Sequence, residues 1–388
     1  MNSQNYFLTD RLSKICIITL IFIPKIDLIP IANFWQGIRY EDILISCFVI
    51  YFFLSKKNNT TIKLNNFQYK NFYYFFLYLF FSNIVGILSG LDVQIVSIIR
   101  LIEYIFFLFL IDCIKINKLI VLSLLKYFLL INLFVGIFQI FDLIGSISSL
   151  GYKDASNTIN QRVLGITGGS WELSILCSLS YLFIFQNEKS KLQITIFFII
   201  TSFLVIVSES KTQTAAFIIL KAILLIKNGN LLLLIIIVLA AILSILNIEI
   251  NIFIKLKEID LSYLYELTYN VIFQNKLPRA DEIKDQFIHL SYWYRLRLWQ
   301  YLANEYTTNI FTIFFGTGFT RIYVESLWIR VLFSSGFIGL LYILYLVRNM
   351  NIIYIIYFSI AGLTLDLFVS LKIFLFTLII VKKNFYEK

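Results

Sequence analysis

The sequence is short of charged residues, histidine and proline, and each shortage excludes a class of protein or site. Charged residues make up 14% of its 388 residues and hydrophobic residues 59%, whereas soluble domains are about 25% charged and about 45–50% apolar. This composition excludes a soluble globular protein. The single histidine, His289, cannot form a multi-histidine metal site. Apolar runs recur along almost the whole chain without a proline- or glycine-rich linker, so we expect one integral membrane domain over residues 1–388.

Cysteine spacing and charge distribution remove two further possibilities. The four cysteines lie singly in or beside apolar runs, without a CxxC pair: Cys16, Cys47, Cys113 and Cys177. Neither disulfides nor structural zinc is therefore expected. The net charge of +10 would suit nucleic acid if it formed one basic patch, but lysine and arginine fall in short gaps between apolar runs. That distribution indicates membrane orientation and no nucleic-acid partner.

The apolar runs predict an all-α polytopic membrane protein. A helix needs about 20 apolar residues to cross the hydrocarbon core, and this criterion gives about twelve transmembrane helices. They cover approximately residues 13–32, 40–55, 70–89, 93–113, 119–143, 169–186, 192–208, 211–227, 231–249, 326–347, 350–365 and 367–382. The first run is expected to stay in the protein as a helix, because it lacks a small-residue cleavage site.

Loop charges set the orientation of these helices. Most lysine and arginine of the short loops fall in alternate loops, and by the positive-inside rule those loops are cytoplasmic. With an even number of spans, both termini are cytoplasmic as well. Loops 32–40, 144–168 and 250–325 then share the opposite, outer side.

Loop 250–325 is too long for a simple connection, because helices are usually joined by about 2–8 residues. Apolar side chains recur every three to four residues over 281–305, which predicts an amphipathic helix. They are Ile283, Phe287, Leu290, Tyr294, Leu298 and Tyr301. Such a helix would lie on the membrane surface, cover a cavity or fill the helix bundle.

Charged side chains near the predicted outer ends of the spans are the informative ones, because an ionisable group inside lipid is costly. Arg162 precedes a glycine-rich segment, 165–169, that leads to Glu172, and glycines allow backbone amides to approach an anion. A very short turn sets Glu209 and Lys211 at the membrane face. A flexible loop and a plain hairpin with a local ion pair are the alternatives.

The long loop adds two arginines on the predicted amphipathic helix. Arg295 and Arg297 are about 200° apart on a helix, so at most one faces a given ligand. Arg295, one turn before Trp299, is our choice. Arginines bound to water or lipid headgroups are the alternative.

A Gly-Thr-Gly turn, 316–318, precedes Arg321 and Glu325 at the outer end of the tenth span. A carboxylate at a membrane boundary is partly desolvated, as a working general base often is. The alternative is a helix-end carboxylate paired with Arg321 or Arg330. Inside the spans, Arg100 with Glu103, and Asp366 with Lys372, are expected to pair and fix helix packing.

In their order along the chain, these motifs resemble segments of the O-antigen polymerase and O-antigen ligase superfamily. The features similar to the end of its large periplasmic loop are Arg295 four residues before Trp299, Gly316-Thr317-Gly318, Glu325, and Gly336 with Gly339. Upstream, residues 162–165 leading to Glu172, and the turn 208–211, resemble further family segments. The likeness covers residues 160–345 approximately.

Two departures from the family bear on function. The ligases carry a histidine near the position of Glu325, which favours a polymerase over a ligase. Many members have arginine where Lys211 stands, and lysine cannot form a bidentate fork. An O-antigen ligase acting on lipid A core, a lipid-linked oligosaccharide flippase and a structural membrane component stay open as alternatives. The long outer loop 250–325 argues against a flippase, and the paired arginines argue against a purely structural component.

The resemblance implies a C-type glycosyltransferase-like membrane fold in the bacterial inner membrane, with an active site that opens to the periplasm. Its partners would be undecaprenyl-diphosphate-linked oligosaccharides and membrane lipid, and a chain-length regulator stays open as a further partner. The growing glycan would pass from one carrier to the repeat unit on another.

Within that mechanism, Arg162 and Arg295 are assigned to the diphosphate, because guanidinium groups stabilise the charge that develops on the leaving group. Glu325 is the first candidate for the base, and Glu172 is a second candidate or orients the acceptor. Further candidates for diphosphate binding are Arg297, Lys211 and Arg321. No cofactor or metal is required, because the arginines supply the neutralising charge.

Reporter fusions test the predicted topology. Fusions at Lys56, Lys189 and Lys227 should report a cytoplasmic location, and fusions at Lys153 and Asp281 a periplasmic one, because loop charge alternates in that sense. The readout is paired phosphatase and fluorescent-protein activity. A cytoplasmic signal at Asp281 would contradict a periplasmic active site.

Overall fold

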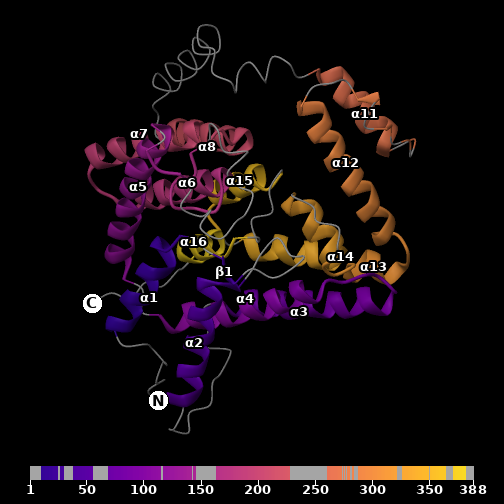
Figure 1. Cartoon of the computed structure of the whole chain (residues 1–388), viewed down its shortest axis with the longest axis horizontal. Helices are drawn as coiled ribbons and strands as arrows, with labels where there is room; N and C mark the ends of the chain where they lie inside the picture. The colour runs from indigo at the N-terminus through magenta and orange to yellow at the C-terminus, as the bar shows by residue number, and fades with distance from the viewer. Residues whose placement is uncertain are drawn as a thin grey trace. The chain divides into compact units, whose positions relative to one another are not determined.

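The computed structural model (Figure 1) describes residues 10–24, 27–29, 38–55, 69–114, 117–141, 143–145, 163–227, 260–272, 274, 276, 278–279, 282–283, 287–320, 326–348, 350–363 and 370–381. These residues are mostly α-helical, which confirms the predicted all-α fold class. They divide into two compact units, and each unit is described by itself.

Unit 1 comprises Met1–Phe76, Arg100–Thr214 and Leu367–Lys388. Its elements are α1 (Asp10–Phe22), β1 (Asp27–Ile29), β2 (Ile38–Arg39), α2 (Tyr40–Ser55), α5 (Lys118–Ile140), α6 (Ser170–Asn187), α7 (Lys191–Val207), α16 (Leu371–Val381), the start of α3 (Lys70–Leu88) and most of α4 (Ile95–Cys113). Helix α6 packs against α5, α7 and α16, and almost all its side chains are buried. It is therefore the central helix of this unit.

Unit 2 comprises Leu77–Ile99 and Ala215–Asp366. Its elements are most of α3 and of α8 (Lys211–Lys227), then α11 (Leu261–Ile272), α12 (Phe287–Tyr306), α13 (Ile310–Phe315), α14 (Leu327–Val347) and α15 (Ile352–Ala361). Helix α14 packs against α12 and α13, and α12 also packs against α11, as Figure 1 shows. The long loop 250–325 therefore contains helices of its own, as its length predicts.

A helix overlaps every predicted span except the ninth, 231–249, which falls outside the described residues. Three of these helices, α3, α5 and α14, are long and apolar enough to cross a membrane. Shorter apolar helices lie in the runs of α1, α7, α8, α15 and α16. Helix length and apolar composition thus agree with a membrane protein.

The first predicted span, 13–32, is wrong in extent. Helix α1 ends at Phe22, because Pro24 lacks an amide donor and its ring disfavours helical backbone at the residue before it. The chain then forms a short antiparallel pair in which Asp27 of β1 lies opposite Arg39 of β2. The apolar composition of 13–32 hid this break.

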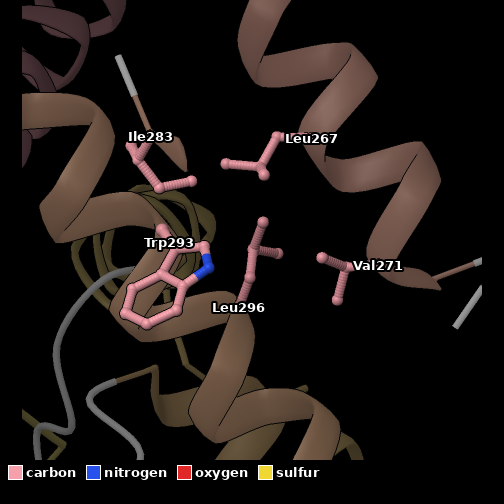
Figure 2. Close-up of a cluster of buried hydrophobic side chains, with 5 residues drawn as sticks. All are labelled: Leu267, Val271, Ile283, Trp293 and Leu296. Atoms are coloured by element: carbon pink, nitrogen blue, oxygen red, sulfur yellow. The ribbon is translucent and has the colours of Figure 1, made fainter. Parts of the chain in front are cut away.

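The predicted amphipathic helix is present as α12, and the side that packs on α11 is centred on Trp293 and Leu296. These two side chains are 3% and 1% exposed, and they pack with Leu267 and Val271 of α11 (Figure 2). Of the predicted apolar positions, Ile283 is buried in this cluster and Leu290 packs against it, whereas Tyr294, Leu298 and Tyr301 are 50%, 37% and 45% exposed.

Trp293 is the aromatic residue buried in this contact. Its indole covers a large apolar area between α11 and α12, and its Nε1–H donates to the carbonyl of Pro278 at 2.9 Å. A buried tyrosine at position 294 would need a partner for its hydroxyl group instead. The three exposed side chains form an apolar stripe beside the buried side of α12.

Two leucines of α12 test which face is buried. Leu296→Ala should destabilise the chain by about 2–5 kcal/mol, because it opens a cavity between α11 and α12. Leu298→Ala, two residues later and 37% exposed, is the matched control and should cost far less. Thermal unfolding of the purified protein measures both, and equal losses would contradict the observed face.

Candidate functional site

Residues 163–169 of unit 1 are not helical, yet most of them are buried. A buried amide without a partner costs about 1–3 kcal/mol, so this segment depends on side chains of its neighbours. Gln139 Oε1 on α5 accepts from two of its amides, at 3.0 and 2.9 Å. Asn132 Oδ1, also on α5, accepts from the amide of Ile166 at 3.0 Å. Helix α5 therefore holds the segment inside the unit.

Glu172 lies at the end of this segment, in the first turn of α6, and is 1% exposed. One carboxylate oxygen accepts from the amide of Gly168 at 2.7 Å, and the other accepts from the hydroxyl group of Ser370, just before α16. The glycine segment does bring an amide to an anion, and that anion is the carboxylate of Glu172 itself. Both oxygens are engaged within the protein, which favours an orienting role for Glu172 over a direct base.

Lys372 lies on α16, two residues after Ser370. Its ammonium group has the charge opposite to that of the Glu172 carboxylate. Its buried Nζ has no hydrogen-bond partner among the residues that the structure describes. The carboxylates of Glu172 and Glu41 both act on it electrostatically. Its expected partner, Asp366, lies outside the described residues.

Arg100 and Glu103 pair as predicted, with 2.5 Å between Nη1 and Oε2. The same nitrogen lies 2.5 Å from Oδ1 of Asp42 on α2, which the sequence did not identify as a partner. The other oxygen of Asp42 accepts from the amide of Arg39, whose guanidinium lies 3.7 Å from Glu41. A cluster of opposite charges therefore joins α2 and α4 at their predicted outer halves.

The predicted turn between the seventh and eighth spans is confirmed, because α7 ends at Val207 and α8 begins at Lys211. Glu209 adopts a positive φ of 52°, which is uncommon for a residue with a side chain. The hydroxyl group of Ser208 lies 2.5 Å from that of Ser174 on α6, and this contact fixes the turn. The side chain of Lys211, like the whole of Arg162, lies outside what the structure describes.

In unit 2, the Gly-Thr-Gly segment crosses a break in α14. Gly336 interrupts that helix with a φ of 67°, so carbonyl groups before it lose their helical donors. The amides of Thr317 and Gly318 donate to two of them, on Phe333 and Ser334, at 2.8 and 3.0 Å. The hydroxyl group of Tyr78 donates to a third, on Ser335, at 2.8 Å.

This crossing leaves no room for side chains at its two glycines. A Cβ atom on Gly316, whose φ is 91°, would lie 2.2 Å from the carbonyl oxygen of Ser334. A Cβ atom on Gly336 would lie 2.3 Å from the carbonyl oxygen of Phe314. Gly316 and Gly336 both contribute to the resemblance described above. The backbone around each of them is in direct contact with the backbone around the other.

The two arginines of α12 differ in what they contact. The guanidinium of Arg297 lies 5.5 Å from the ring centre of Trp293 and 5.6 Å from that of Tyr301, so it covers the aromatic face of its own helix. Arg295 is partly exposed and, by its spacing on the helix, points nearly the opposite way.

Arg321 and Glu325 fall in 321–325, outside the described residues. The residues on either side are fixed: Thr320 is buried and pairs with Val93, and buried Ser326 occupies the N-cap position of α14. The candidate residues belong to different units by chain segment. Arg162, Glu172 and Lys211 belong to unit 1, and Arg295, Arg297, Arg321 and Glu325 belong to unit 2.

Sequence reasoning missed the residues that hold these segments, chiefly Asn132, Gln139, Asp42 and Ser370. The amides of Asn132 and Gln139 give the only local signal, because a polar side chain within an apolar run needs a partner. Among the described residues, no group of three or more His, Cys, Asp or Glu could hold a metal ion. No family model, curated protein or solved structure matches the chain.

The close approach of Gly316 and Gly336 predicts that replacing either with alanine is more harmful than the same change at an open glycine. Gly316→Ala and Gly336→Ala should each lower the abundance of folded protein sharply, because a contact near 2 Å adds to a backbone penalty of about 1–2 kcal/mol. Gly90→Ala is the matched control: it has a φ of 77° but open space around its Cβ position. Size-exclusion profiles of membrane extracts measure all three. Equal losses would show that backbone strain alone matters.

Proposed function

We propose that the chain is a polymerase of the O-antigen type, or of a related surface polysaccharide, in the bacterial inner membrane. It joins oligosaccharide repeat units carried on undecaprenyl diphosphate at the periplasmic face. About twelve transmembrane helices, with both termini in the cytoplasm, place loop 250–325 on that face.

The observation that carries this proposal is how the two resembling stretches fold. Residues 163–172 and 316–336 both contain buried, non-helical backbone whose polar groups are held by neighbouring side chains and carbonyls. In membrane proteins, non-helical backbone occurs where it is buried or lines a cavity, and broken helices commonly form substrate sites. A chain used only as a structural bundle would not need either of these two non-helical stretches.

The proposed reaction breaks the bond between the anomeric carbon of the growing glycan and its diphosphate carrier. A hydroxyl group on the acceptor repeat unit forms the new glycosidic bond, and its proton passes to a carboxylate. Glu325 supplies that carboxylate, while Glu172 orients neighbouring groups from its buried position. Arginine guanidinium groups, with Arg162 and Arg295 first, stabilise the diphosphate as it leaves.

A deletion strain separates the candidate functions. Without a polymerase, lipid A core should still receive a single repeat unit, because ligation survives. Without a ligase, the core should carry no glycan and polymer should remain on the carrier lipid. Gel electrophoresis of lipopolysaccharide distinguishes these patterns, and an unchanged ladder would contradict both enzymes.

The arginines of α12 test the contact with the diphosphate. Arg295→Ala should abolish long chains, since loss of one well-placed electrostatic stabiliser costs about 100- to 1000-fold in rate, or about 3–4 kcal/mol. Arg295→Lys should recover only a minor part, because lysine supplies charge without the two-pronged geometry. The readout is polymer length at equal membrane abundance.

Arg297→Ala is the control on the same helix. It removes the contacts with Trp293 and Tyr301, so it should lower thermal stability more than polymer formation. Loss of polymer in Arg297→Ala but not in Arg295→Ala would reverse the assignment of the two residues. Normal polymer in both variants would contradict a role of loop 250–325 in binding the diphosphate.

A further inference from the structure

Unit 1 contains a small cavity beside the buried ammonium group of Lys372. Its lining includes Thr19 of α1, Glu41 of α2, Phe107 of α4, and Lys372 and Leu375 of α16. Its volume, counted for a sphere the size of a water molecule, is about 20 Å³. By that measure about 10–15 Å³ is enough for one water, so the cavity has room for one small molecule and little more.

Among the described residues, none forms a hydrogen bond with Lys372, which lines this cavity. An ammonium group has three donors, and Nζ of Lys372 is buried without a partner among the described residues. A buried charged group without hydrogen bonds is expensive, and buried polar groups of this kind are usually met by an internal water. The apolar part of the lining, such as Phe107 and Leu375, cannot accept these hydrogen bonds.

We propose that one internal water occupies this cavity and connects Lys372 with Glu41 and Thr19. The water accepts a hydrogen bond from the ammonium group and donates its two protons to acceptors. Thr19 is suited to accept, because its own proton is directed to backbone carbonyls of α1 at 2.8 and 3.0 Å while its oxygen keeps free lone pairs. Three hydrogen bonds match the usual number for a buried water.

The charges around the cavity favour water over an ion. A bound anion would face the carboxylate of Glu41, and a bound cation would face the ammonium group of Lys372. Water satisfies both groups without adding charge.

Radiolytic labelling of the full chain in lipid nanodiscs tests this water. X-rays turn bound water into hydroxyl radicals, which oxidise the side chains next to it even where bulk water does not reach. Phe107 and Leu375, at 0% and 1% exposed, should be oxidised several-fold more than Phe376 and Leu378, at 1% and 0%, which do not line the cavity. Peptide mass spectrometry measures each pair of like residues.

Lys372→Met keeps the length of the side chain and removes its donors, so the cavity should dry and the excess label on Phe107 and Leu375 should disappear. Should that variant fail to accumulate, Thr19→Val removes an acceptor with little change in shape and should also reduce the label. Equal labelling of lining and control residues in the unmodified chain would overturn the proposal. So would label that persists in a folded Lys372→Met variant, or label that falls when chloride replaces gluconate, which would indicate a bound anion.

Discussion

Backbone groups that leave the helical ladder inside an apolar bundle must find partners within the protein, and this requirement shapes both units. In unit 1 the partners are side chains, because Asn132 and Gln139 of α5 accept the amides of the segment before α6. In unit 2 the partners are chiefly backbone groups, because the break at Gly336 frees carbonyls that accept from the amides of Thr317 and Gly318, and the hydroxyl group of Tyr78 donates to a third. The two solutions differ in chemistry and meet the same constraint.

Buried charge is subject to the same constraint. Arg100 lies between two carboxylates, and Glu172 accepts from an amide and a hydroxyl group. A buried ion pair adds little net stability, yet removal of one member typically costs about 3–5 kcal/mol. Such groups therefore do more to fix which helix ends meet than to strengthen the fold. Glu172 and Ser370 connect α6 with the start of α16 in this way.

Apolar run length was enough to locate the described helices that overlap the predicted spans, because each helix needs only local sequence to satisfy its backbone. It failed where a single residue overrides composition, as Pro24 does after α1. It could not show which side of α12 packs on α11, because that contact depends on residues of α11, which local spacing does not include. The partner of Glu172 is Ser370, 198 residues away, and no single-sequence pattern connects them.

The glycines of the candidate site have a different role from the one that their sequence suggests. A glycine-rich segment with free amides would bind an anionic ligand directly. Here the amide of Gly168 is engaged by Glu172, and that of Gly318 by the broken helix α14. The glycines instead permit close approach between backbone segments. The hydrogen bonds of their amides then hold the ends of each segment in place. In the proposed function, recognition of an anionic substrate depends on the charged side chains that adjoin those ends, and rigid support of such groups is what electrostatic stabilisation of a leaving diphosphate requires.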